Sequence, residues 1–169
     1  MHQLVAISLI VLSSIAYAKT IDEVDAAFKS GDYPQALRIL RGLASKNDVE
    51  AQYRLGALHE SGTNISQSYI EAVKCYRLAA TGSSSKAQYS LASMYLNGLG
   101  VPQDFTKAHV WFNLAAIWGN SEAASSRESV AKRMLVQQVA EAKRLQENAG
   151  KETTKVVIER ICMLPPIQI

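Results

Sequence analysis

The chain has 169 residues, enough for one domain, and its 48% hydrophobic and 20% charged residues are typical of a globular protein. The net charge of +3 is small, and the basic residues are interleaved with acidic ones, so we do not expect a nucleic-acid partner. Only 7% of the residues are aromatic, and the apolar content is mostly alanine and leucine, which favours closely packed helices over a β-sandwich.

The first eighteen residues have the layout of a secretory signal peptide. Leu4 to Ile15 is apolar or small throughout, and Ala16-Tyr17-Ala18 follows as a small-x-small cleavage site. The region before Leu4 contains no lysine or arginine, which is unusual for a signal peptide. An uncleaved anchor is the alternative, but about 14 residues fall short of the roughly 20 that a spanning helix needs. We therefore expect cleavage after Ala18, a periplasmic or secreted protein, and no stable membrane insertion afterwards.

Export predicts an oxidising compartment, in which the two cysteines could pair. A bridge between Cys75 and Cys162 would close a long loop and stabilise the fold by about 4–5 kcal/mol on the chain-entropy estimate. Cys75 occupies a position that the helix pattern buries, and Cys162 lies in the C-terminal tail. Two unpaired thiols therefore remain the alternative.

The mature chain opens with a short helical hairpin. Ile21 to Ser30 is predicted to be an amphipathic helix that ends at Gly31. Asp32 is predicted to cap a second helix, Tyr33 to about Ser45, with Pro34 in its first turn, where a missing N–H costs nothing.

The middle of the chain contains one pattern twice, with a period of 36 residues and no gap. The matched positions are Ala51 and Ala87, Gln52 and Gln88, Tyr53 and Tyr89, Leu55 and Leu91, Gly62 and Gly98, Ala72 and Ala108, and Tyr76 and Phe112. A fixed period of this size predicts a solenoid of helix–turn–helix repeats. Alanines at the predicted crossing points allow the helix axes to approach closely.

The turn inside each repeat is predicted from residues that tolerate a positive φ. Gly98 and Gly100 end one helix in the second copy, and Asp104 caps the next helix. In the first copy Asn64 stands in place of Gly100, and Ser68 stands in place of Asp104. Asparagine is the next best residue for the left-handed region, so we expect the same turn in both copies.

The C-terminal part is predicted to close the array. Ser121 is expected to cap a helix running to about Arg133, and a last helix is expected from Leu135 to about Gln146, so that the pair covers the final repeat. The predicted fold is an all-α, right-handed α/α solenoid with a C-terminal capping helix pair. The predicted domains are a signal peptide (1–18), a solenoid (19–147) made of a partial repeat (about 21–50), two full repeats (51–86 and 87–122) and the cap (121–147), and a tail (148–169). The tail carries an apolar run and either folds back or remains mobile.

The repeats resemble the SEL-one-like repeat family, α/α solenoid relatives of the tetratricopeptide repeats. The second copy agrees with the family pattern at Ala87, Leu91, Tyr95, Gly98, Gly100, Val101, Asp104, Lys107, Ala108, Trp111, Phe112, Ala115, Ala116, Gly119 and Ala123. It departs at Ala92, where the family usually has glycine. The first copy agrees at Ala51, Leu55, Gly56, Gly62, Ala72, Tyr76, Ala79 and Ala80, and departs at His59, Asn64, Ser68 and Cys75.

The resemblance implies a non-catalytic scaffold that binds another protein in the bacterial periplasm or envelope, or after secretion. The alternative is an exported hydrolase or a small-ligand-binding protein, because a cysteine-rich branch of the family is linked to β-lactam binding. That branch carries a pair of cysteines in each repeat, which this chain lacks, so its activity is not carried over.

No group of residues with catalytic, cofactor-binding or metal-binding spacing stands out. His59 and His109 lie on different predicted helices without a His-x-x-His spacing, so packing or solvated roles are expected for both. Cys75 has no neighbouring histidine or helix start to lower its pKa, so it is not expected to be a nucleophile. We therefore predict neither an enzyme nor a cofactor.

The predicted partner-binding face is the concave side, which the first helix of each repeat should line. Tyrosine recurs there beside small residues, and rigid aromatic area of this kind is typical of binding hot spots. The candidate residues are Tyr53, Arg54, Ala57, Tyr89, Ser90, Ser93 and, separately, Trp118, where the family usually has a polar residue. The alternative is that the tyrosines pack between helices and that Trp118 touches only the cap.

Overall fold

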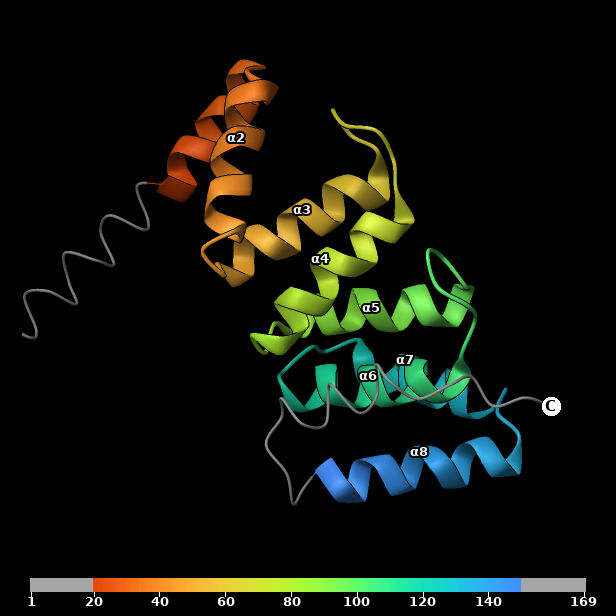
Figure 1. The fold of residues 1–169 in the computed structure, drawn as a ribbon. Coiled ribbons are helices and arrows are strands. Elements are labelled where there is room, and N and C mark those ends of the chain that lie inside the picture. Colours follow the sequence, from red (N-terminus) through yellow and green to blue (C-terminus); the bar gives the residue numbers. More distant parts are fainter. Residues whose placement is uncertain (1–19, 150–169) are drawn as a thin grey trace, which may run out of the picture.

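The computed structural model describes residues 20–149, and this part of the chain is entirely helical outside its turns. The helices stack one after another from the N-terminal hairpin to the C-terminal cap (Figure 1). After a helix over residues 20–30, they are α2 (Tyr33–Ala44), α3 (Val49–Ser61), α4 (Tyr69–Thr81), α5 (Ser85–Asn97), α6 (Phe105–Ile117), α7 (Ala123–Ala131) and α8 (Val136–Ala149). The predicted all-α solenoid is confirmed.

The caps predicted from the sequence start the second helix of each hairpin. The Asp32 carboxylate accepts from the amide of Gln35 at 3.1 Å, and the Asp104 carboxylate accepts from the amide of Lys107 at 2.9 Å. The Ser68 hydroxyl takes the same role for α4 at 3.3 Å. Each cap satisfies an amide that has no partner inside its own helix.

The turn between the two helices is built in the same way in both full repeats. The side chain of Gln67 donates to the carbonyl of Glu60, and 36 residues later the side chain of Gln103 donates to the carbonyl of Leu96, both at 2.8 Å. Asn64 has φ 63° and Gly100 has φ 70°, so the predicted left-handed position is confirmed in both copies. The turn geometry therefore follows from local sequence.

The start of the cap differs from the prediction. Helix α7 begins at Ala123 and ends at Ala131, and Ser121 does not cap it. The Asn120 side-chain oxygen accepts from the amides of Glu122 and Ala123, both at 3.1 Å. The side chain of Asn120, directly after Gly119, therefore satisfies the free amides at the start of α7 in place of Ser121. The last helix begins near the predicted position and continues past Gln146 to Ala149.

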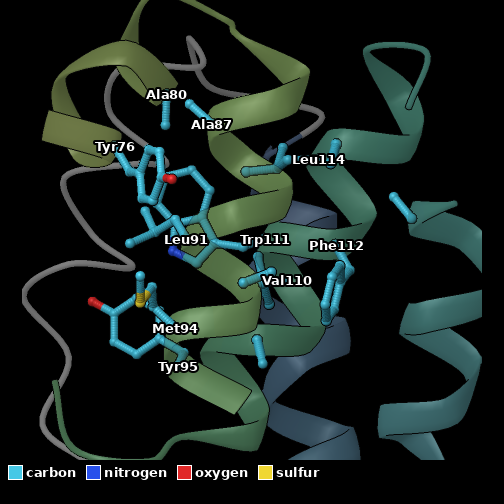
Figure 2. Close-up of a cluster of buried hydrophobic side chains, with 14 of the residues drawn as sticks. Tyr76, Ala80, Ala87, Leu91, Met94, Tyr95, Val110, Trp111, Phe112 and Leu114 are labelled. Atoms are coloured by element: carbon cyan, nitrogen blue, oxygen red, sulfur yellow. The ribbon is translucent and has the colours of Figure 1, made fainter. Parts of the chain in front are cut away.

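The buried side chains form two clusters. The larger one runs from α4 to α8 and is centred on Leu91, Met94, Trp111 and Phe112, which are all less than 2% exposed (Figure 2). The smaller one joins the N-terminal hairpin to α3. Its buried members are Val24, Leu37, Leu40, Ala51 and Leu55, and Cys75 packs against its edge. The N-terminal hairpin is therefore held by a core of its own.

Three predictions fall on residues outside 20–149: the signal peptide, the tail and the state of Cys162. Cys75 is half-buried and free within the described residues. In the same part of the chain, no helix combines the length and the apolar character needed to cross a membrane.

Candidate protein-binding face

A hollow of about 500 Å³ opens beside the C-terminal half of α3, between this helix and the N-terminal hairpin. Its walls are almost wholly apolar. It is lined by Phe28, Leu40, Tyr53, Arg54, Ala57, Leu58, Ser61, Thr63 and Asn64. Three of the predicted partner-binding residues, Tyr53, Arg54 and Ala57, therefore lie together at one site.

The hollow exists because the first hairpin has a shortened turn. Residues 31 and 32 are the whole connection between the first helix and α2, whereas residues 62–68 and 98–104 form the turns of the full repeats. The longer turns place apolar side chains on the core: Ile65 in one copy, Leu99 and Val101 in the next. The first hairpin has no residue to do this, so the space beside Leu58 stays unfilled.

The turns after α3 and α5 differ at the positions of Asn64 and Gly100. A Cβ on Gly100 would lie 2.4 Å from the backbone of Tyr69, so this turn presses directly on the preceding repeat. Asn64 carries a side chain at the same position, is exposed, and lines the hollow. At position 64, by contrast, a side chain is accommodated beside the hollow.

Arg54 forms one wall of the hollow and is held by two carboxylates. Its guanidinium donates to Asp25 at 2.6 Å and to Glu50 at 2.9 Å, and hydrogen bonding to Glu50 raises the pKa of Arg54. Asp25 belongs to the first helix, so this pair joins the hairpin to α3. Because Arg54 and Asp25 are 30% and 45% exposed, the pair contributes little stability, about 1 kcal/mol or less. Its main effect is to fix the position of the wall.

Tyr53 is half-buried: it packs against the larger cluster and also lines the hollow. Its ring lies 5.8 Å from the ring of Tyr76, and the Lys86 ammonium lies 5.9 Å from its centroid. Burial, followed by the nearby Glu50 and Glu60 carboxylates, raises the pKa of Tyr53. The tyrosine therefore packs against α4 and lines the hollow, so packing between helices does not exclude a place on the predicted binding face.

The equivalent positions on α5 lie along the same helix face, and the cap contacts some of them. The ring of Tyr89 packs edge-on against Phe112 at 5.2 Å, and its hydroxyl lies 3.4 Å from the Ser126 hydroxyl of α7. Ser93 donates to the Tyr89 carbonyl, and Ser90 is half-buried. The cap thus occupies part of the surface that the prediction left free for a partner.

Trp118 lies apart from these residues. It is the C-cap of α6 and is 47% exposed, with Ile117 beside it at 69%. The two side chains form a small apolar patch at the turn into α7. The structure therefore brings together three of the seven predicted residues, places three further along the array, and separates Trp118.

Sequence reasoning missed the glutamines that connect successive repeats. Gln52 and Gln88 are 4% and 0% exposed, and each side chain donates at 3.3 Å to a carbonyl at the end of the preceding hairpin, Ala44 and Ala80 respectively. The side-chain nitrogen of each glutamine is paired in this way and fixes the register between repeats, whereas Oε1 of Gln88 has no partner within the described residues. The signal was present, because a polar residue recurred at a position that the helix pattern buries.

His109 and Cys75 have surroundings that suit packing. Gln146 and His109 pair side chain to side chain at 3.2 Å, and burial together with Arg127 lowers the pKa of His109. Burial also raises the pKa of the Cys75 thiol, which disfavours the thiolate. Within residues 20–149, no group of three or more His, Cys, Asp or Glu side chains could hold a metal ion.

Comparison with known proteins identifies the repeats. The Sel1 repeat model matches residues 49–84 and 85–117. The crystal structure of c5321, a protective antigen present in uropathogenic Escherichia coli strains that displays an SLR fold, is similar with a TM-score of 0.73 and 23% identity. This similarity covers 89% of the present chain and 33% of c5321.

A second solved structure, a Sel1 repeat protein from Oxalobacter formigenes, has a TM-score of 0.53 and 32% identity. The match covers 54% of the present chain and 38% of that protein. The matched part thus spans only 33% of the first solved protein and 38% of the second. A search of curated proteins gives no significant match.

Proposed function

Because residues 49–117 are two Sel1 repeats, which generally mediate contacts between proteins, we propose that the chain is a non-catalytic adaptor that acts after export. The observation that carries the proposal is the apolar hollow on α3, lined by three residues at predicted binding positions. An open hollow with an aromatic wall suits an apolar side chain of a partner protein, surrounded by the polar rim that interfaces usually have.

The proposed location, the periplasm or envelope or the medium, is supported by the sequence of the first eighteen residues. Expression of the full gene product in a bacterial host, followed by fractionation and intact-mass measurement, tests it. We expect a mature chain that begins at Lys19 in the periplasm or the medium. A full-length chain in the cytoplasm would refute export while leaving the binding proposal intact.

The binding proposal is tested by purification of partners from the envelope fraction, with substitutions that act on the hollow. Ala57→Arg places a charged side chain in the hollow, and Ser93→Arg is the matched control, because it introduces the same side chain at the equivalent position of α5, outside this hollow. We expect Ala57→Arg to lose most of the captured partner and Ser93→Arg to retain more of it. Both variants must keep the wild-type melting temperature.

Single truncations separate the predicted residues. Tyr53→Ala is expected to weaken partner binding most, because Tyr53 lines the hollow, and Tyr89→Ala and Trp118→Ala are expected to weaken it less. If all three variants bind the partner like wild type, the assignment of this face is wrong.

The size of the hollow supports small-ligand binding as a second candidate, since sites for small molecules occupy about 300–1,000 Å³. The titratable wall residues are Tyr53 and the ion-paired Arg54, and this set favours an apolar ligand over a substrate that needs acid–base chemistry. A thermal-shift screen with apolar small molecules distinguishes the candidates. Stabilisation that Ala57→Arg abolishes would favour the small ligand over the partner protein.

A further inference from the structure

The start of α8 exposes apolar side chains to solvent. Val136 is 82% exposed, the highest value among the large apolar residues of the described part of the chain, and the preceding Leu135 is 49% exposed. The buried residues of α8, Ala142 and Leu145, lie on the opposite side of the helix from Val136 and belong to the larger cluster. Since burial of apolar surface is favourable, the outward side of α8 is a candidate contact surface.

A second hollow, which we call the α8 cleft, adjoins Val136. It has a volume of about 310 Å³ and is lined by Met134, Val136, Val139, Ala140 and Lys143. Val136, Ala140 and Lys143 follow one another at helical spacing along the outward side of α8. The exposed residues and the cleft therefore form one apolar strip, which begins at Leu135 and ends at Lys143.

Basic residues border this strip. Residues 132–144 contain four basic side chains and one acidic one, so this segment alone accounts for the chain's net charge of +3. Arg144 pairs with the acidic residue, Glu141, at 2.8 Å. Among the described residues no carboxylate forms an ion pair with Lys132, Arg133 or Lys143. Cations without a carboxylate partner thus stand at both ends of the strip.

The position of α8 leaves this surface open. The helix is the last layer of the stack, at the end opposite the N-terminal hairpin (Figure 1). Glu147 lies on the same side of α8 as Val136, but about three turns further along, so its carboxylate is remote from the exposed turn. The charge beside Leu135 and Val136 is therefore positive.

The composition of the strip favours a lipid surface over a protein. Interfaces between proteins are enriched in aromatic residues and depleted in lysine, whereas this strip has lysines and no aromatic ring. An apolar side chain that protrudes among basic residues matches the boundary of an anionic lipid layer. The apolar group enters the acyl boundary there, and long basic side chains reach the headgroup phosphates.

We propose that the turn 132–135 and the outward side of α8, together called the α7–α8 tip, bind the surface of a membrane that contains anionic lipid. Leu135 and Val136 enter the headgroup boundary, and Lys132, Arg133 and Lys143 contact the phosphates. The contact is peripheral and reversible, because it uses few apolar side chains. It leaves the hollow beside α3 free, and it does not depend on the proposed binding of a partner protein.

Co-sedimentation of the full chain with lipid vesicles tests the contact. One set of vesicles contains phosphatidylcholine and phosphatidylglycerol in equal parts, and the other contains phosphatidylcholine alone. We expect stronger binding to the anionic set and a loss of that binding as salt is added. The first eighteen residues contain no lysine or arginine, so binding through them does not favour the anionic set. Equal binding to both sets would overturn the proposal.

Charge reversal locates the basic part of the contact. Lys132→Glu together with Lys143→Glu should weaken binding to the anionic vesicles by about tenfold or more. Lys29→Glu together with Lys46→Glu is the matched control, because both lysines are exposed near the other end of the array and the net charge changes equally. The control should retain most of the binding. An equal loss in both variants would show that net charge rather than the tip attracts the lipid, which would overturn the proposal.

A single substitution tests the apolar part. Val136→Asp should weaken binding to the anionic vesicles several-fold and leave the melting temperature unchanged, because Val136 is so exposed. Ile70→Asp is the matched control, since Ile70 is 59% exposed on α4, and it should bind like wild type. If Val136→Asp also binds like wild type, the apolar contact does not exist.

A measurement on the unmodified chain keeps the proposal testable if the variants fold poorly. In NMR spectra with bicelles of the same anionic mixture that carry a spin-labelled lipid, the amide signals of residues 132–143 should be attenuated most. Attenuation centred on another surface would overturn the proposal. Changes of the same signals with protein concentration, in the absence of lipid, would assign the tip to a second copy of the chain and would also overturn it.

Discussion

In the repeat that begins at Val49, the second helix exposes Ile70 and Leu78, whereas the same positions of the next repeat, Thr106 and Leu114, are buried. The first helices of the two repeats show the same difference in exposure. Leu58 of α3 is half-buried at the edge of the hollow, and its equivalent on α5, Met94, is 1% exposed. Two copies of one pattern therefore present different surfaces.

The difference comes from the neighbours of each copy. The repeat that begins at Ser85 lies between a complete repeat and the cap, whose helices α7 and α8 both pack on α6. The preceding repeat adjoins a hairpin with a two-residue turn, which leaves space on α3. The hollow therefore lies where the neighbour of a repeat is incomplete.

The largest difference is expected at the pair Trp111 and Cys75. Trp111→Ala removes a fully buried ring and should lower the free energy of unfolding by about 3–5 kcal/mol. Cys75→Ala removes one half-buried sulfur and should cost about 1 kcal/mol or less. Urea denaturation of both variants measures this, and similar losses would mean that the two copies are packed alike.

The pair Gly100 and Asn64 tests how closely each turn packs on the preceding repeat. Gly100→Ala combines a left-handed backbone with a contact of 2.4 Å to the Tyr69 backbone, and we expect a loss of about 2 kcal/mol or more. Asn64→Gly should be nearly neutral, because Asn64 already holds φ 63° on an exposed turn. Melting temperatures check both, and a neutral Gly100→Ala would show that the turn can move away.

The pair Gly56 and Ala92 tests packing within a repeat. A Cβ on Gly56 would lie 2.6 Å from the ring of Tyr76, so Gly56→Ala should overpack the core and cost about 1–3 kcal/mol. Ala92→Gly, in the next copy, should cost about 2 kcal/mol, from helix propensity and from the loss of a fully buried methyl group. A stabilised Gly56→Ala, measured by the same denaturation, would mean that the Tyr76 ring shifts freely.

The smallest expected effect is a difference in the pH dependence of stability, which arises at Tyr76 because the equivalent Phe112 has no hydroxyl. Burial and the 2.6 Å hydrogen bond to Glu60 raise the pKa of Tyr76 well above its ordinary value, so the folded protein keeps the proton that the unfolded chain releases above about pH 10. Stability from this group is therefore complete below pH 10 and falls above it, by up to about 1.4 kcal/mol per pH unit.

Tyr76→Phe should flatten that decline relative to wild type. The Cys75 thiol, whose pKa is also raised, is present in both proteins and cancels in the comparison. Unfolding measured at pH 9, 10 and 11 gives the difference, and parallel curves for the two proteins would contradict the role of the Tyr76 hydroxyl.

Much of the fold could be predicted because its determinants lie close together in sequence. Asp32, Ser68 and Asp104 cap helices through amides three residues away, and Asn64 and Gly100 fix turns through their own φ angles. The prediction failed at Ser121, where Asn120 competes for the same amides from one residue earlier. Asparagine and serine are both good capping residues, so the sequence alone does not show which of two neighbours caps the helix.

The candidate site was predicted only in part. The period of 36 residues placed Tyr53, Arg54 and Ala57 on one face, but it placed Tyr89, Ser90 and Ser93 there equally. Phe28, Leu40 and Asn64 carried no mark of a shared site. They meet only because the first hairpin has a short turn and is joined to α3 by the Asp25–Arg54 pair.

The sequence by itself determined the repeat, its caps, its turns and the small residues at the helix crossings, since each depends on hydrogen bonds or spacing within a few residues. The tertiary structure decided which copy of each repeated residue is covered. Burial is a property of the neighbours that surround a side chain, and the first hairpin and the cap provide different neighbours to otherwise equivalent positions.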